Sequence, residues 1–411
     1  MTQQQSHAHH YVPQWYQRRF LAAGETKYFY LDLQPETIVQ SGVSHQRRAL
    51  LNWGPARCFY KDDLYTLKFG QKTTDAMERL FFGMVDTRGR EAVELLADYH
   101  GITKGASDAL RDLAPYMGAQ RFRTPKGLDE IRKRTAWIYP GPNAALQALQ
   151  IVFQSYATMW MEGVWEFARA TQSPTKFIVS DNPVTFYCKV MFPSDWNYPD
   201  DASLKQIGTR TLFPLGPDCC LIITHLQLAR NPWSTPTEHR ENARYYDQTL
   251  KHMGEIQFGR ELQEDEVLRI NYILKKRATR YIAAANKEWL YPERHVSTAE
   301  WKSLDDDWFL LPHLWKVSFT SEIIMGGDDW AWSMDEYGRH PGQAGYRNKK
   351  MHDRDWETKE IAKREWAKKR AGKPFAQVDK FEHGDVHDKL MQEFLEQEGL
   401  LPAAQAAAPE E

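Results

Sequence analysis

The chain has 411 residues, of which 42% are hydrophobic and 26% charged, values typical of a globular protein. Its net charge of −2 excludes the global basic field of non-specific nucleic-acid binders, although 53 Lys and Arg residues leave room for a local basic groove. The four cysteines form no C-x-x-C pair, which argues against a cysteine zinc site and favours a reducing compartment. There is no signal-peptide pattern and no apolar run near the roughly 20 residues that span a bilayer, so we expect a cytoplasmic protein without membrane contact.

The first half of the chain predicts one strand followed by helices. Residues 27–33 alternate in the manner of a strand, whereas residues 34–56 are rich in turn-forming residues. Apolar positions recur at helical spacing from 74 to 116. Residues 143–170 carry a broad apolar stripe, which predicts the strongest helix, buried against the rest of the domain.

The second half mixes strands and helices. Residues 176–184 form a β-branched and aromatic run that ends on Asp, Asn and Pro, which indicates a buried strand with a loop at its end. Residues 211–225 predict a turn followed by an apolar strand, and residues 262–285 predict an amphipathic helix. A charged helix is expected over residues 347–371.

Together these elements predict an α+β fold: a helix-rich single large domain around a small β-sheet, with a C-terminal extension. The chain exceeds the usual size of one hydrophobic core, which favours one large domain plus an appendage. We expect the core domain over residues 7–288, a Trp-rich and charged helical extension over 289–395, and a disordered tail over 396–411.

The first polar group that could carry chemistry is the opening segment HAHHYVPQWYQRRF, residues 7–20. If it is helical from Pro13, three polar residues lie one turn apart on one face, namely Gln14, Gln17 and Arg18. Arg18 or Arg19 could then hold a phosphate, and His10 would precede the helix start, where anions are favoured. Alternatively, the aromatic residues simply dock an N-terminal helix on the core. The histidines form no zinc motif, so no metal is expected.

The second group is QRFRTPK, residues 120–126, in which basic residues surround an aromatic ring. This pattern suits a phosphate backbone with a stacked base. The polar residues concerned are Gln120, Arg121, Arg123 and Lys126. Thr124 and Pro125 can start a helix. The alternative is a solvated loop with one buried Phe.

The third group is SDNP, residues 180–183, at the end of the predicted buried strand. A strand would hold such a carboxylate rigidly while the loop exposes it. Asp181 could act as general base on water or stabilise a developing oxocarbenium ion, and Asn182 could hydrogen-bond a base edge or orient that water. The alternative is an Asx-turn that closes the strand.

The fourth group holds His and Asp residues near the C-terminus, at 352–355 and 383–388. Their spacing could bind a metal, but each lies in a charged stretch, which favours a solvated surface. The chain contains no P-loop, dinucleotide-binding or nucleophile-elbow motif. ATPase, Rossmann and α/β-hydrolase interpretations therefore lose their usual support, and no cofactor is expected.

Five short motifs in a fixed order also resemble one family: HHYVPQWYQRRF, QRFRTP, SDNP, FPLGP and Asn271 inside the last predicted helix. They are similar to the bacterial proteins grouped as domain of unknown function 4238, which open on H-Y-V-P-x-x-Y-L-x-x-F. The resemblance covers roughly residues 7–285, and Gln17 replaces the usual Leu. It implies that the polar motif residues converge on a site; these are His10, Gln14, Arg18, Gln120, Arg123, Asp181 and Asn271.

The resemblance implies an activity as well, because proteins of this type occur among anti-phage genes and at least one is a DNA glycosylase directed at a hypermodified phage base. We therefore expect a glycosylase that flips out and excises a modified, glucosylated base of double-stranded phage DNA, without a cofactor or an obligate protein partner. The expected catalytic residues are Asp181, His10 and Asn182. The expected DNA-binding residues are Gln14, Arg18, Arg19, Gln120, Arg121, Arg123, Lys126 and Asn271.

Two alternatives belong to other classes of protein. In a metal-dependent nuclease, His9 or His10 and Asp181 would bind Mg²⁺ or Zn²⁺. Such an enzyme cleaves strands and is stopped by a chelator, whereas a glycosylase leaves abasic sites and ignores EDTA. In a non-enzymatic nucleic-acid sensor, the same residues would only bind.

Overall fold

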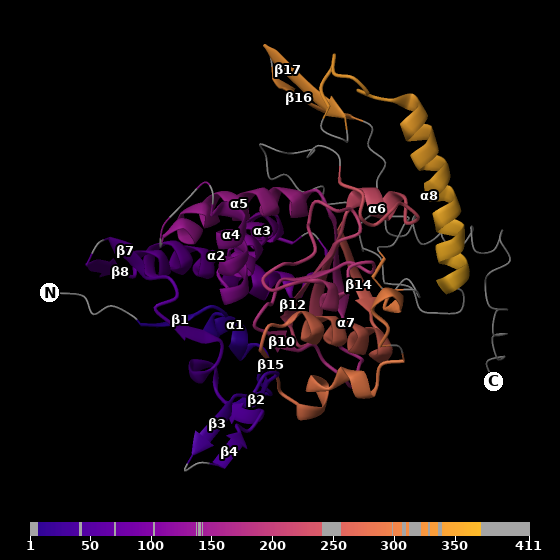
Figure 1. The fold of residues 1–411 in the computed structure, drawn as a ribbon. Coiled ribbons are helices and arrows are strands. Elements are labelled where there is room, and N and C mark those ends of the chain that lie inside the picture. Colours follow the sequence, from indigo (N-terminus) through magenta and orange to yellow (C-terminus); the bar gives the residue numbers. More distant parts are fainter. Residues whose placement is uncertain are drawn as a thin grey trace, which may run out of the picture.

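The computed structural model describes residues 7–40, 43–69, 71–101, 103–136, 143–240, 256–297, 299–305, 310–311, 322–327, 329–335 and 339–370, together with residues 138 and 141. Helices and small sheets form one α+β domain, as predicted (Figure 1). None of the helices in these ranges is long and apolar enough to cross a bilayer.

A layer of helices covers one face of the domain (Figure 1). A π-helical turn (Met77–Phe82) leads into α2 (Gly83–Leu96), α3 (Ala106–Phe122), α4 (Pro125–Thr135) and α5 (Ala144–Met161). The helices expected within 74–116 are confirmed. The long helix expected over 143–170 is wrong beyond Met161, because residues 164–169 form a strand. Gly163 marks the change: a Cβ there would lie 2.6 Å from the side chain of Ile223, so the chain turns where it meets a neighbouring strand.

The central sheet has five strands, of which the order across the sheet is β11 (Thr185–Tyr187), β12 (Arg210–Gly216), β13 (Cys219–Thr224), β9 (Val164–Arg169) and β14 (Ile256–Glu261). The pairs are antiparallel except for β14 and β9. The expected turn and strand at 211–225 is therefore a hairpin of two strands. Short helix α6 (Leu226–Arg230) follows β13.

The central sheet lies between two hydrophobic cores. Along β13, Leu221 and Ile223 face the core under α2–α5, whereas Cys220 and Ile222 face a second core. Helix α7 (Glu264–Arg277) closes that second core. Trp301 and Leu304 are also buried in it, so residues beyond 288 pack against the domain.

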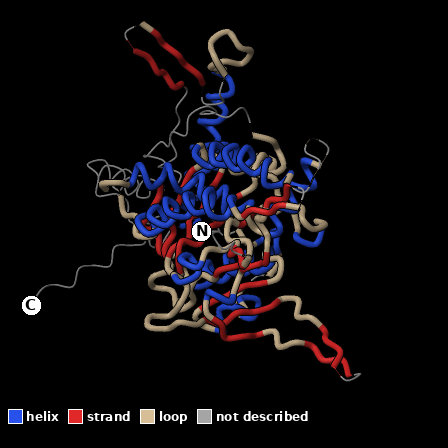
Figure 2. The backbone as a smooth tube through the Cα atoms, turned by 90° about the vertical axis from the view of Figure 1, so that its left-hand side faces the viewer, coloured by secondary structure: helices blue, strands red, loops and turns tan. Residues whose placement is uncertain are grey.

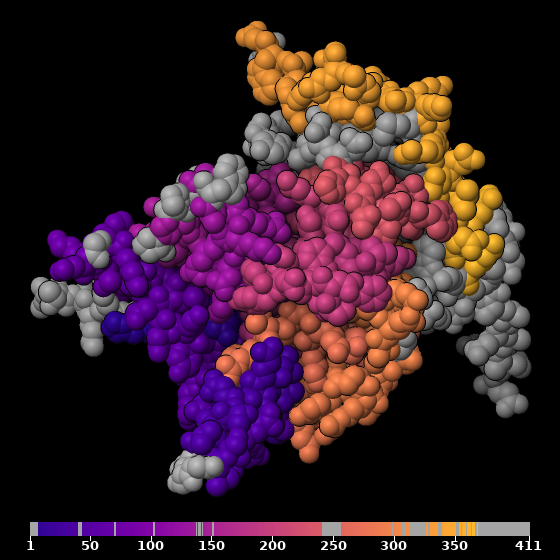
Figure 3. All heavy atoms as spheres, viewed as in Figure 1, coloured from indigo at the N-terminus to yellow at the C-terminus, as the bar shows by residue number. Residues whose placement is uncertain are grey.

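A second, four-stranded sheet joins the two ends of the domain. Its order is β10 (Val179–Ser180), β15 (Tyr281–Ala284), β2 (Tyr28–Asp32) and β5 (Leu50–Trp53), all antiparallel. Figure 3 shows this meeting of N-terminal residues, in indigo, with the orange residues around β15. The strand expected at 27–33 is confirmed. The helix expected over 262–285 is wrong after Arg277, because residues 281–284 pair with β2 instead.

The remaining elements are small ribbons and terminal pieces. They are β1 (Ala8–His10) with β6 (Tyr60–Asp62), α1 (Gln14–Arg18), and the hairpins β3 (Thr37–Gln40) with β4 (Val43–Gln46), β7 (Leu67–Phe69) with β8 (Lys72–Thr74), and β16 (Glu322–Gly327) with β17 (Trp330–Asp335). Hairpins β3–β4 and β16–β17 project from opposite ends of the molecule (Figure 2). The expected charged helix is α8 (Lys349–Arg370). The tail at 396–411 lies outside the described residues.

Short 3-10 turns link several of these elements. They are η1 (Pro55–Arg57), η3 (Pro193–Asp195), η5 (Lys287–Leu290), η6 (Pro292–Arg294) and η7 (Trp301–Ser303). The stretch 34–56 was expected to consist of turns. It also contains the β3–β4 hairpin and strand β5, which forms the edge of the four-stranded sheet.

Candidate functional site

Helix α1 begins after Pro13, as predicted, and carries a polar row on its outer side. Nε2 of Gln14 lies 3.4 Å from Nε2 of His10, and Nη2 of Arg18 donates to Oε1 of Gln14 at 3.2 Å. Arg18 is exposed. Gln17 does not share this face: it is fully buried and donates to the carbonyl of Val12 at 2.7 Å. The row is thus His10, Gln14 and Arg18.

The other polar residues of the opening segment hold the fold together. His9 is buried, stacks on Tyr65 and accepts the backbone N–H of Tyr65 at 2.9 Å. Arg19 donates from Nε to the carbonyl of Leu215 at 2.6 Å and so ties α1 to β12 rather than facing solvent for a phosphate. Burial lowers the pKa of His10 below its usual value. The buried aromatics of this segment, Tyr11, Tyr16 and Phe20, anchor it in the core.

The segment 120–126 contacts the opening segment from the end of α3. Gln120 and Arg123 both donate to the carbonyl of Tyr11, at 2.8 and 3.2 Å. Arg123 also donates to Asp86 at 2.9 Å. Gln120 and Arg123 are fully buried, so they position the N-terminal segment and do not reach a DNA backbone in this conformation.

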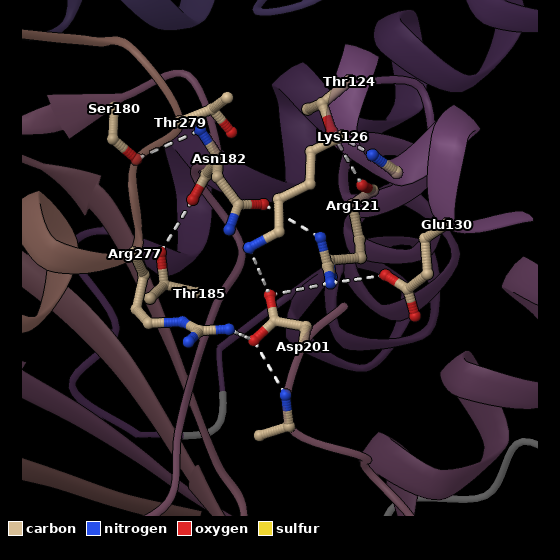
Figure 4. Close-up of polar contacts among 12 residues, drawn as sticks. Arg121, Thr124, Lys126, Glu130, Ser180, Asn182, Thr185, Asp201, Arg277 and Thr279 are labelled. Carbon is tan, nitrogen blue, oxygen red and sulfur yellow. Dashed lines mark hydrogen bonds and ion pairs between the residues drawn. The ribbon is translucent and has the colours of Figure 1, made fainter. Parts of the chain in front are cut away.

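Arg121 and Lys126 turn the other way, into a buried group of charges that we call the Asp201 cluster (Figure 4). Its members are Arg121, Lys126, Glu130, Asp201 and Arg277. Oδ2 of Asp201 lies 3.0 Å from Arg121 Nη2 and 2.9 Å from Lys126 Nζ, and its other oxygen pairs with Arg277. Glu130 accepts from Arg121 at 2.8 Å. Burial and the neighbouring guanidinium of Arg121 lower the pKa of Arg277 to about 10.

Local sequence explains how two cations reach the same cluster. Thr124 caps α4, and its hydroxyl accepts the N–H of Gly127 at 3.0 Å, while Pro125 occupies the first helical position as predicted. Gly127 allows α4 to pack tightly on the end of α3, since a Cβ there would lie 2.3 Å from the carbonyl oxygen of Arg121. This close turn places Arg121 and Lys126 beside each other.

Asp181 follows β10 and is 5% exposed. Its carboxylate accepts the backbone N–H groups of Thr279, Arg280 and Tyr281, at 2.8, 2.6 and 2.9 Å. Burial raises the pKa of Asp181, and these three N–H groups oppose the rise. They come from the turn between α7 and β15, far along the chain, so the carboxylate bonds to this turn rather than to His10, Gln14 or Arg18.

Asn182 links this strand end to the Asp201 cluster. Its Oδ1 accepts from Arg121 Nη1 at 3.1 Å. Its side chain is fully buried, and Nδ2 has no hydrogen-bond partner in the part of the chain that the structure describes. Asn271, by contrast, accepts the N–H of Ile178 and donates to the carbonyl of Lys176, which fixes the chain ahead of β10.

Sequence patterns missed three members of the cluster. Asp201 lies in a loop beside another Asp, Glu130 lies within α4, and Arg277 is one of several basic residues at the end of α7. None belongs to a recognisable motif. From the sequence alone, an acidic loop residue such as Asp201 is expected to be solvated, whereas the fold surrounds it with cations.

The structure also bears on possible metal ligands. Among the described residues, no three His, Cys, Asp or Glu side chains gather where they could hold an ion. His9 accepts the N–H of Tyr65, His10 lies beside Gln14, and the carboxylate of Asp181 accepts three backbone N–H groups, so none of these contacts joins either histidine to Asp181 as expected for a nuclease. In the pattern at 352–355, Asp353 and Arg354 are exposed on α8, as expected for a solvated face. The pattern at 383–388 lies outside the described residues.

Fold and site define an α+β protein in which three motifs abut in a row: the opening segment, residues 120–126 and the turn after β10. A family described as "Protein of unknown function (DUF4238)" matches residues 8–145, about a third of the chain. The match includes the first two motifs; SDNP, FPLGP and Asn271 lie beyond it. No curated protein and no solved structure matches the chain.

Proposed function

We propose that this chain is an anti-phage DNA glycosylase that flips out a modified, glucosylated base of double-stranded DNA and hydrolyses its glycosidic bond, in the cytoplasm where phage DNA is copied. One observation supports this most strongly. The hydrogen bond from Arg121 to Asn182 brings the carboxylate-bearing turn after β10 against the cations of residues 120–126. A fixed carboxylate, an amide donor and cations are the groups that cleavage of a sugar–base bond in DNA needs.

The carboxylate of Asp181 stabilises the positive charge that develops in this reaction. As the bond from C1′ to the base nitrogen breaks, its electrons leave with the base and positive charge develops on the sugar. A carboxylate held by three backbone N–H groups stabilises that cation without having to reorganise, and it does so most strongly where water is excluded. Water then adds to C1′ and loses a proton, which leaves an abasic site.

Asn182 recognises the flipped nucleotide. A buried amide donor without a partner costs free energy, which an acceptor on the flipped base or its sugar would recover. Its carbonyl side is fixed by Arg121, so Nδ2 has a defined direction.

The polar row on α1 supplies the backbone contact. Arg18 is exposed and donates to Gln14, which in turn lies beside His10. No hydrogen bond or ion pair among the described residues joins this row to Asp181, so we assign His10 to DNA contact rather than to proton transfer.

The direct test incubates the purified full chain with glucosylated and unmodified phage DNA, with and without EDTA. We expect mass spectrometry to identify a released modified base, alkali to reveal abasic sites, and EDTA to change neither result. If no base is released from any DNA, the proposal is wrong. Strand breaks that EDTA abolishes would instead support the nuclease.

Two variants test the assigned roles. Asn182→Asp keeps the shape and the acceptor for Arg121 but removes the donor, so base release should fall about 100-fold. Asp181→Asn should lower it by a similar factor, about 100-fold. Asn197→Asp and Asp195→Asn, at exposed positions of a nearby loop, are the matched controls. If Asp181→Asn leaves phage restriction intact while loss of Arg18 removes it, the chain is a sensor and not an enzyme.

A further inference from the structure

The Asp201 cluster holds more positive than negative charge. Arg121, Lys126 and Arg277 contribute three cations, and Asp201 and Glu130 contribute two carboxylates. Asp201 alone faces all three cations, so its charge is divided among them. An arginine cannot lose its proton at accessible pH, whereas a lysine can. Lys126 is therefore the cation of this cluster that can give up a proton.

Lys126 is also the member of the cluster that lies nearest to solvent. Its side chain is 9% exposed, whereas those of Arg121 and Asp201 are 0% exposed and that of Arg277 is 4% exposed. In Figure 4 its amino group extends between Asp201 and the amide of Asn182, the residue with the unpartnered donor.

The surroundings of Lys126 make it easier to deprotonate than a surface lysine, although its ion pair of 2.9 Å with Asp201 favours the protonated form. Burial lowers the pKa of Lys126 well below its usual value, and the guanidiniums of Arg277 and Arg121 lower it further, while Glu130 and Asp181 act in the opposite direction. A lysine that is desolvated beside other cations is a known form of activated nucleophile. The same amine on the protein surface would be protonated and unreactive.

We propose that Lys126 is a nucleophile toward the aldehyde of an abasic deoxyribose, which gives the chain a strand-nicking lyase activity. The inference rests on the proposed function for the source of that sugar, but the chemistry needs only an abasic site. The geometry supplies an amine, a carboxylate 2.9 Å away that can exchange protons with it, and a polar neighbour for the sugar.

The step conserves atoms and electrons. The Nζ lone pair adds to C1′ of the open-chain aldehyde, and the former carbonyl oxygen leaves as water, which gives an imine. A carboxylate of the site takes a proton from C2′, the C3′–O bond breaks, and the 3′ phosphate leaves with the bonding electrons. Water then hydrolyses the imine and frees the amine. No oxidant or reductant takes part.

The experiment uses a duplex oligonucleotide with a preformed abasic site and the full-length chain. Sodium borohydride reduces an imine to a stable amine, so we expect a covalent protein–DNA adduct, and peptide mapping should place it on Lys126. Lys126→Arg keeps a cation beside Asp201 but removes the amine, and it should lose both the adduct and the nick. Lys133→Arg, an exposed position on the same helix, should retain both.

The outcomes separate this inference from the proposed function. If modified base is released but no adduct or nick forms at the preformed abasic site, Lys126 is not a nucleophile and the glycosylase stands. If the adduct maps to Lys126 but no base is ever released, the lyase activity is supported and the glycosylase function is wrong. An adduct that maps to other lysines, or that Lys126→Arg retains, overturns the inference. Mapping on the wild-type chain decides the matter even when the variant does not fold.

Discussion

Arg121 and Asn182 lie 61 residues apart in the chain and are joined by a hydrogen bond of 3.1 Å from Nη1 to Oδ1. Both side chains are fully buried, so the bond forms away from water and each group depends on the other. The same guanidinium reaches Glu130 and Asp201. Arg121 is therefore the residue through which the end of α3, the turn after β10 and the Asp201 loop become one site.

Asp201→Asn should destabilise the protein strongly. It removes the carboxylate that faces three buried cations, and breaking a buried ion pair on one side costs about 3–5 kcal/mol. Asp200→Asn is the matched control, because Asp200 pairs with the half-exposed Lys133, and its loss should cost about 0–1 kcal/mol. Urea unfolding measures both. Equal losses for the two variants would show that the cluster contributes nothing special to stability.

Arg18→Gln should leave stability unchanged within about 0.5 kcal/mol, because the side chain is exposed. If Arg18 contacts a phosphate, the variant should bind duplex DNA more weakly, and the slope of log affinity against log salt should fall by about 1. Fluorescence anisotropy over a salt series measures the slope. Arg111→Gln, at another exposed arginine, is the control. Identical slopes for wild type and Arg18→Gln would remove α1 from the DNA surface.

His225 should make the folded state sensitive to acid. Burial lowers the pKa of His225 from 6.5 to about 4, so between these values the unfolded chain binds a proton that the folded chain does not. Stability from this residue is thus present above pH 6.5 and is lost as the pH falls toward 4, by about 3 kcal/mol in total. His225→Gln should flatten this part of the pH profile, whereas His45→Gln, at an exposed position, should not. Urea unfolding between pH 4 and 7 provides the comparison.

Glu78 should act in the opposite direction. Burial raises the pKa of Glu78 from 4.5 to about 7, although the nearby charge of Arg123 opposes the rise. The folded chain then holds a proton that the unfolded chain has lost, so stability falls as the pH rises from 4.5 to 7. Because the side chain is partly exposed, we expect Glu78→Gln to be more stable than wild type at pH 8 by about 2 kcal/mol. The control is Glu91→Gln, and a variant without this gain would contradict the assignment.

Several elements followed from local sequence. The alternation at 27–33 predicted β2, Pro13 predicted the start of α1, and Thr124 with Pro125 predicted the start of α4. In each case the signal and the structure involve the same few residues: a capping side chain, a proline φ angle, or an apolar face of one strand. Residues close in the sequence were therefore sufficient to predict these elements.

Other elements required the folded chain. Residues 164–169 and 281–284 continue apolar patterns that suit a helix, yet they are strands because β13 and β2 offer them partners. Asp181 shows the same dependence: its position after a strand was predictable, but its partners are backbone N–H groups about 100 residues away.

The sequence by itself determined that the chain is an α+β protein, that residues 8–145 carry a family pattern, and that polar motifs stand at 7–20, 120–126 and 180–183. Only the tertiary structure decided that Arg123 serves the N-terminal segment while Arg121 and Lys126 enter the Asp201 cluster. The physical reason is that a pattern reports which side chains are polar, whereas their charge state and role depend on burial and on partners that the fold brings from elsewhere in the chain.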